Sequence, residues 1–155
     1  MPIWSIATMK IFAEAMELAK KGDRRQAIVL ADRFAAESAE SFVTADADGL
    51  AMIIAPLVNF YQAVEEWELA ALKSKDVCAL AEKLCPDTSE TAGDYTHLAT
   101  ALEHLGSHAD AISALENAER HLRGAGVWES YADGYKQRLA HLRQLQSGVP
   151  PQLKA

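Results

Sequence analysis

The sequence predicts an all-α protein of about seven helices that pair as antiparallel hairpins. Apolar residues recur every three or four positions along almost the whole chain, which is the periodicity of an amphipathic helix. No segment alternates apolar and polar residues between hairpin turns, as a half-buried strand would. Short turns containing Gly or Pro separate the apolar stretches, so the helices are expected to be joined by tight connections.

Composition excludes several classes of protein. The chain has 155 residues, of which 50% are hydrophobic and 24% charged, and this is enough for one domain with its own core. A formal net charge of −7 argues against binding to nucleic acids or to anionic membranes, because both require a basic face. The most apolar stretch, 50–58, is too short to span a membrane, and residues 1–10 lack the pattern of a secretory signal. We therefore expect a cytoplasmic protein.

The first hairpin is predicted on either side of Gly22, which marks a tight turn. Its two apolar stripes contain Ile6, Met9, Phe12, Ala13, Met16 and Leu18, followed by Ala27, Ile28, Ala31, Phe34, Ser38 and Phe42. The second helix is expected to end near 44–49, where Asp46 and Asp48 are suited to capping.

The second hairpin is predicted from a helix over 50–64 and another from Trp67 to about Leu84. Pro56 falls either in the first turn of the third helix or at a kink within it. Pro86 is a strong stop for the fourth helix. Cys78 and Cys85 are seven residues apart, so they are expected on one helical face as core residues, too far apart to form a disulfide.

The third hairpin is expected to start near Thr91 and Asp94, which have the spacing of a capping box, and to turn at Gly106. A seventh helix follows 123–126, and residues 147–155 form a tail. The stripes of these three helices contain Tyr95, Leu98, Ala99 and Leu102; Ala111, Ile112, Leu115, Ala118 and Leu122; and Trp128, Tyr131, Ala132, Tyr135, Leu139 and Leu142.

An internal repeat relates these hairpins. Gly22 and Gly106 are 84 residues apart, and the small residues Ala27, Ala70 and Ala111 follow at spacings of 43 and 41. Small residues are needed where two paired helices approach closely, so the repeating unit is a helix pair of roughly 42 residues.

The segment YTHLATALEHLGSHADAISALENA, residues 95–118, resembles a tetratricopeptide repeat over nearly its full length. The earlier copies depart from the pattern, since Glu14 stands where leucine is expected and Glu65 replaces the turn glycine. The units are also longer than the usual 34 residues. The resemblance implies one domain over 1–146, stacked as a short right-handed superhelix, with units 5–45, 48–86 and 89–124 and a capping helix at 127–146.

The resemblance also implies a concave groove lined by the first helix of each pair. The side chains carried over to this groove are Met9, Phe12, Met16, Lys20, Asn59, Gln62, Thr96, Thr100, Glu103, His104, Glu129, Asp133, Lys136 and Gln137. Such a surface suits an amphipathic helix or an extended peptide. The alternative for Met9, Phe12 and Met16 is that they belong to the core.

The histidines do not predict a metal site. His97 and His104 are about 10 Å apart along a helix, and Gly106 interrupts the spacing between His104 and His108. His108 is expected to pack against the turn. Asp46 and Asp48 begin like a calcium loop, but Ala55 stands where its bidentate carboxylate is required. We expect neither a metal nor another cofactor.

We therefore expect a non-catalytic protein-protein interaction module that binds a peptide or helix in the groove. The sequence contains no phosphate-binding loop, nucleophile elbow or dinucleotide-binding motif. Alternatives are a secretion chaperone, the regulatory lobe of a bacterial signalling system and, in another class, a helical enzyme or metal protein. Self-association through an exposed end of the repeat array is also expected to be feasible.

Overall fold

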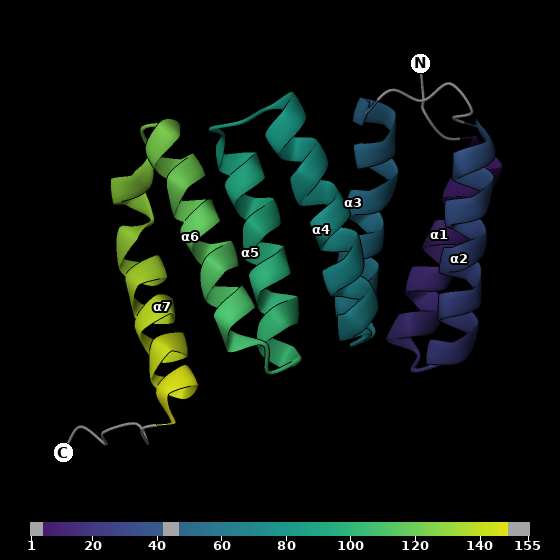
Figure 1. The fold of residues 1–155 in the computed structure, drawn as a ribbon. Coiled ribbons are helices and arrows are strands. Elements are labelled where there is room, and N and C mark those ends of the chain that lie inside the picture. The colour runs from purple at the N-terminus through teal and green to yellow at the C-terminus, as the bar shows by residue number, and fades with distance from the viewer. Residues whose placement is uncertain (1–4, 42–46, 149–155) are drawn as a thin grey trace. The chain divides into compact units, whose positions relative to one another are not determined.

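The protein is all-helical, as predicted. The computed structural model describes residues 5–41 and 47–148, without the side chains of 39–52, and these ranges contain no strand (Figure 1). The described helices are α1 (Ile6–Lys20), α2 (Arg24–Ser41), α3 (Ala47–Ala63), α4 (Trp67–Leu84), α5 (Ser89–His104), α6 (His108–Gly124), the short 3-10 helix η1 (Trp128–Ser130) and α7 (Ala132–Ser147). None of the described helices is long and apolar enough to cross a membrane.

The chain divides into two compact units, Met1–Leu80 and Ala81–Ala155. The boundary falls near the end of α4, so the last turn of that helix belongs to the second unit. The first unit packs α1 against α2 and α2 against α3, whereas the second packs α5 against α6 and α6 against η1 and α7.

An aromatic cluster holds the first unit together. The ring of Phe12 lies 4.8 Å from that of Phe34 and 6.3 Å from that of Phe60, measured between centroids. Phe34 and Phe60 are fully buried. The hydroxyl of Tyr61 also donates a 2.9 Å hydrogen bond to Asp32, which joins α3 to α2. Phe12, expected in the groove or in the core, is part of this core cluster.

The three hairpin turns have the same backbone structure. Gly22, Glu65 and Gly106 all have positive φ, at 81°, 59° and 73°. In each turn this residue donates its N–H to the carbonyl three residues back, and the next residue donates to the carbonyl five back. This is the Schellman arrangement that ends many helices. Glu65 thus adopts the left-handed conformation that glycine adopts in the other two turns.

Each of these turns is followed by a buried small residue. Ala27, Ala70 and Ala111 have no exposed surface. Side chains as small as alanine allow two helices to approach within contact distance of each other's backbone. The repeat inferred from residue spacing is therefore also present in the turns and in the burial pattern.

Two predicted helix starts need correction. α3 begins at Ala47, so Pro56 lies in the interior of the helix rather than its first turn. The N-cap of α5 is Thr88, whose side chain accepts a 3.1 Å hydrogen bond from the backbone N–H of Thr91. The hydroxyl of Thr91 instead donates to the carbonyl of Cys85 at 2.7 Å. The cap was misplaced by one turn because both threonines precede the apolar stripe.

Several residues predicted in the apolar stripes are exposed, among them Ile6 at 76%, Ala13, Cys85 and Tyr131. Cys78 is buried, but Cys85 lies beyond the end of α4 and is exposed. Tyr131 is 46% exposed because residues 128–130 form a 3-10 turn, which changes the direction of the chain before α7 begins. Asp46 lies outside the described residues, as does the side chain of Asp48, so their predicted capping role stays a prediction.

Candidate binding site

A row of polar side chains on α5 meets α7. Thr96, Thr100 and Glu103 are spaced by four and three residues and therefore share one helical face. Thr96 Oγ1 lies 2.6 Å from the hydroxyl of Tyr135. Arg138 donates from Nε to Glu103 Oε1 at 2.6 Å and from Nη2 to Thr100 Oγ1 at 2.8 Å. Three of the predicted groove residues thus lie together, held by two side chains of α7.

The threonine hydroxyls determine the direction of these hydrogen bonds. Thr96 and Thr100 donate to the carbonyl oxygens four residues earlier, those of Ala92 and Thr96, at 2.9 and 3.0 Å. A hydroxyl has one hydrogen, so each threonine accepts the bond from α7. Tyr135 is therefore the donor to Thr96.

A pocket of about 400 Å³ opens beside this row, within the second unit. We call it the α5–α7 pocket, and it is lined by Thr96, Leu115, Ser130, Tyr131, Gly134, Tyr135 and Arg138. Leu115 contributes a buried apolar surface from α6, while Tyr131 remains largely exposed. Gly134 leaves open space, since a Cβ added there would meet no atom within 4 Å. The pocket therefore combines an apolar surface with hydroxyl and guanidinium groups.

Trp128 fixes the position of Tyr135. The buried indole packs edge-on against the Tyr135 ring, with 5.7 Å between centroids. The guanidinium of Arg123 lies 4.7 Å from the centre of the indole, on its face. This cation–π contact and the aromatic pair make one wall of the pocket rigid.

The predicted groove residues of the first unit lie on α1 and α3. Met9 is exposed, Met16 is half-buried, and Lys20 is paired with Glu17 at 3.0 Å. Asn59 is exposed on α3, and Gln62 is half-buried.

The remaining predicted groove residues of the second unit are exposed. They are His104 on α5, Glu129 in η1, and Asp133, Lys136 and Gln137 on α7. The α7 residues that contact the polar row are Tyr135 and Arg138, which were not selected from the sequence. A signal existed: Tyr131, Tyr135 and Arg138 repeat the spacing of four and three that is found in the polar row of α5.

Three histidines, His104, His108 and His141, line a second, smaller cavity. It measures about 220 Å³ and is lined by Glu103, His104, His108, His141, Leu142 and Leu145. Nδ1 of His108 is buried without a hydrogen-bond partner among the described residues. The described part of the chain contains no group of three or more His, Cys, Asp or Glu side chains arranged to hold a metal ion. His97 is exposed on α5 and does not line this cavity.

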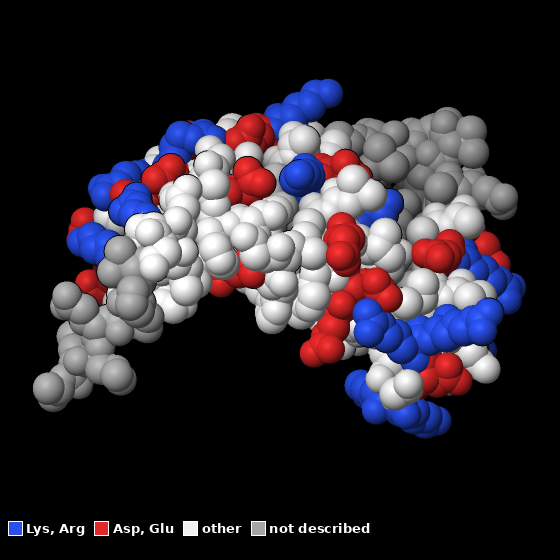
Figure 2. Space-filling view, turned by 60° about the horizontal axis from the view of Figure 1, so that its bottom comes forward, with Lys and Arg blue, Asp and Glu red and all other residues white. Residues whose placement is uncertain are grey.

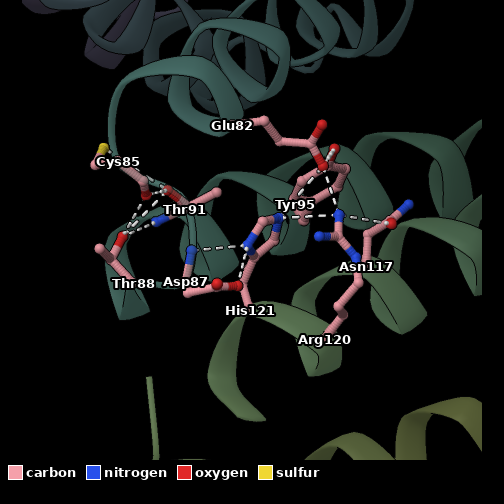
Figure 3. A network of polar contacts seen from close by, with 9 residues as sticks. All are labelled: Glu82, Cys85, Asp87, Thr88, Thr91, Tyr95, Asn117, Arg120 and His121. Atoms are coloured by element: carbon pink, nitrogen blue, oxygen red, sulfur yellow. Dashed lines mark hydrogen bonds and ion pairs between the residues drawn. The ribbon is translucent and has the colours of Figure 1, made fainter. Parts of the chain in front are cut away.

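A polar network joins the end of α4 to α5 and α6 (Figure 3). Oε1 of Glu82 accepts hydrogen bonds from Tyr95 and Arg120, both at 2.6 Å, and lies 3.3 Å from His121 Nε2. The Tyr95 hydroxyl, followed by Arg120 and His121, lowers the pKa of the Glu82 carboxyl despite partial burial. The carboxylate therefore remains ionised at neutral pH.

Both ring nitrogens of His121 have polar neighbours. The backbone N–H of Asp87 donates to Nδ1 at 3.1 Å, and Nε2 lies 3.3 Å from Oε1 of Glu82 and 3.2 Å from Nη2 of Arg120. The buried imidazole stacks on Tyr95, with centroids 5.5 Å apart. His121 therefore joins three helical segments, a role that sequence reasoning missed although it continues the buried stripe of α6.

Charged side chains of both signs are interspersed on the face seen in Figure 2, with a basic group over the α1–α2 hairpin at the right.

Comparison with protein-family models and with curated proteins finds no match for this chain. The geometry of the α5–α7 pocket is therefore the basis for a functional assignment.

Proposed function

We propose that this protein is a non-catalytic interaction module of the tetratricopeptide-repeat kind, which binds a peptide or helix of a partner protein at the α5–α7 pocket. The equivalent hairpin turns and the buried alanines support the repeat resemblance. Repeat proteins present extended surfaces to partners, because each hairpin packs only against its neighbours in the array.

The observation that carries the proposal is the composition of the pocket. Two tyrosines and an arginine surround an apolar surface, and these residue types are enriched where protein interfaces concentrate their binding energy. Tyr135 and Arg138 are held by Thr96, Thr100 and Glu103 before any partner arrives. A preorganised wall lowers the entropy lost on binding.

The lining predicts the chemistry of the partner. An apolar or aromatic side chain would fill the pocket above Leu115, and hydrogen-bonding groups beside it would meet Tyr131, Ser130 and Arg138. Acidic and basic side chains, among them Asp133 and Lys136, lie on the exposed surface of α7. The mixed charge favours a partner segment that also carries both signs.

A cytoplasmic bacterial setting belongs to the same proposal. A secretion chaperone and the regulatory lobe of a signalling system are narrower forms of it, because each acts by binding a protein segment. They differ in partner and share the pocket chemistry.

Selection of a displayed peptide library against the full chain tests the proposal. Selected peptides are expected to bind at least about tenfold more weakly to Gly134→Leu, which fills the pocket. Ala140→Leu adds the same side chain to another exposed position of α7 and should bind as the wild type does. Equal binding to both variants would overturn the assignment of the pocket, and failure to select any peptide would count against the function.

A further inference from the structure

The α1–α2 hairpin carries a groove of its own in the first unit. The groove measures about 400 Å³ and is lined by Glu14, Leu18, Arg25, Gln26, Val29 and Leu30. Val29 is 61% exposed. None of the phenylalanines of the aromatic cluster lines the groove, so it lies outside the packing that holds the first unit together.

Comparison between repeats shows that the α1 side of this groove is open only in the first hairpin. Glu14 and Leu18 correspond in the repeat to Leu57 and Tyr61 of the second hairpin, both 2% exposed. In the third hairpin the corresponding residues, Leu98 and Leu102, are buried as well. The first hairpin instead has an exposed glutamate and a half-buried leucine at these positions.

Opposite charges lie at the two ends of the groove. Arg25 is at the start of α2, next to the hairpin turn, whereas Glu14 is two turns of α1 before that turn. Neither side chain forms an ion pair or a hydrogen bond with another side chain in the part of the chain that the structure describes. By helical rise from the turn, Leu18 and Val29 lie at levels between the two charges, and Leu30 lies level with Glu14.

We infer that this face binds a second copy of the chain about a twofold axis. When two such grooves meet in opposite directions, Glu14 of each copy lies over Arg25 of the other, and their apolar centres pack together. A partner surface of a single charge would leave one of these groups facing a like charge. A groove with an acidic end, an apolar centre and a basic end is complementary to a second copy of itself in the opposite direction.

Sedimentation velocity of the full chain over a range of concentrations tests this inference. The wild type is expected to dimerise, and Glu14→Arg or Arg25→Glu should weaken the dimer by about tenfold or more. The double variant that exchanges the two charges should restore it. These side chains are exposed, so circular dichroism should show unchanged helix content in all variants.

A matched pair tests the apolar centre. Val29→Asp should abolish the dimer, whereas Leu72→Asp should not, although Leu72 is 55% exposed and stands 43 residues later at the equivalent repeat position. A wild type that stays monomeric, a charge exchange without rescue, or equal dissociation by Leu72→Asp would overturn the inference. Each outcome is independent of peptide binding to the α5–α7 pocket.

Discussion

The hydroxyl of Tyr95 lies 2.6 Å from Oε1 of Glu82, so the first aromatic residue of α5 is tied to the last turn of α4. The same oxygen accepts from Arg120 of α6. One carboxylate oxygen therefore connects the last turn of α4 with α5 and α6. It does so beside His121, whose ring is buried against Tyr95.

Removing the Tyr95 hydroxyl should destabilise this junction. Tyr95→Phe keeps the ring stacked on His121 but removes a hydrogen bond to an ionised group, which is worth about 1.5–3 kcal/mol. We expect urea denaturation to show a loss in that range. Tyr131→Phe removes a hydroxyl from an exposed ring and should change stability by less than about 0.5 kcal/mol. Equal losses would mean that the network contributes nothing specific.

Two helical glycines should respond in opposite directions to alanine. A Cβ at Gly124 would collide with the side chain of Asp87, whose backbone N–H is committed to His121. Gly124→Ala should therefore cost about 1–3 kcal/mol, the usual penalty for overpacking. A Cβ at Gly93 meets no atom within 4 Å, so Gly93→Ala should stabilise by about 0.5–1 kcal/mol. Thermal unfolding of both variants checks the pair, and a stabilised Gly124→Ala would contradict the close packing of Asp87.

The helical content and the repeat could be predicted from the sequence because they depend on local signals. Spacing alone identified Ala27, Ala70 and Ala111, and all three are fully buried. The spacing aligned Glu65 with the turn glycines, but its left-handed conformation could not be predicted, since glutamate gives no sign of positive φ. The repeat appears there in the backbone and not in the residue type.

The polar contacts could not be predicted in the same way. Arg138 contacts Glu103, which lies 35 residues away in the chain. His121 accepts from the backbone N–H of Asp87, which lies 34 residues away. Such pairs depend on helix rotation and on side-chain reach, which periodicity does not determine. For the same reason sequence reasoning placed Lys136 and Gln137 in the groove and overlooked Tyr135 and Arg138 on the same helix.

Stability should depend on the ionisation of Asp94. Burial, followed by the nearby Glu90 carboxylate, raises the pKa of Asp94 from 3.8 to about 6. Protonated Asp94 therefore adds to the stability of the fold. This stabilisation is complete below about pH 4 and is lost as the pH rises through about 6. Asp94→Asn should be more stable than the wild type at pH 8 by about 1–2 kcal/mol, with no difference near pH 4.

Urea denaturation at both pH values measures the effect. The exposed residue Asp76 provides a control, since Asp76→Asn should show no such pH-dependent gain. A gain for Asp94→Asn that persists near pH 4 would mean that the carboxylate charge is not its cause.

Photocrosslinking from position 131 inside the native cell tests the proposed binding function most directly. A photoreactive phenylalanine at Tyr131, at the mouth of the α5–α7 pocket, should yield a covalent adduct with a segment of another protein, identified by mass spectrometry. The adduct should disappear when Gly134→Leu is added and should persist with Ala140→Leu. Absence of any protein adduct, or an adduct that survives Gly134→Leu, would contradict the proposal that this pocket binds a protein partner.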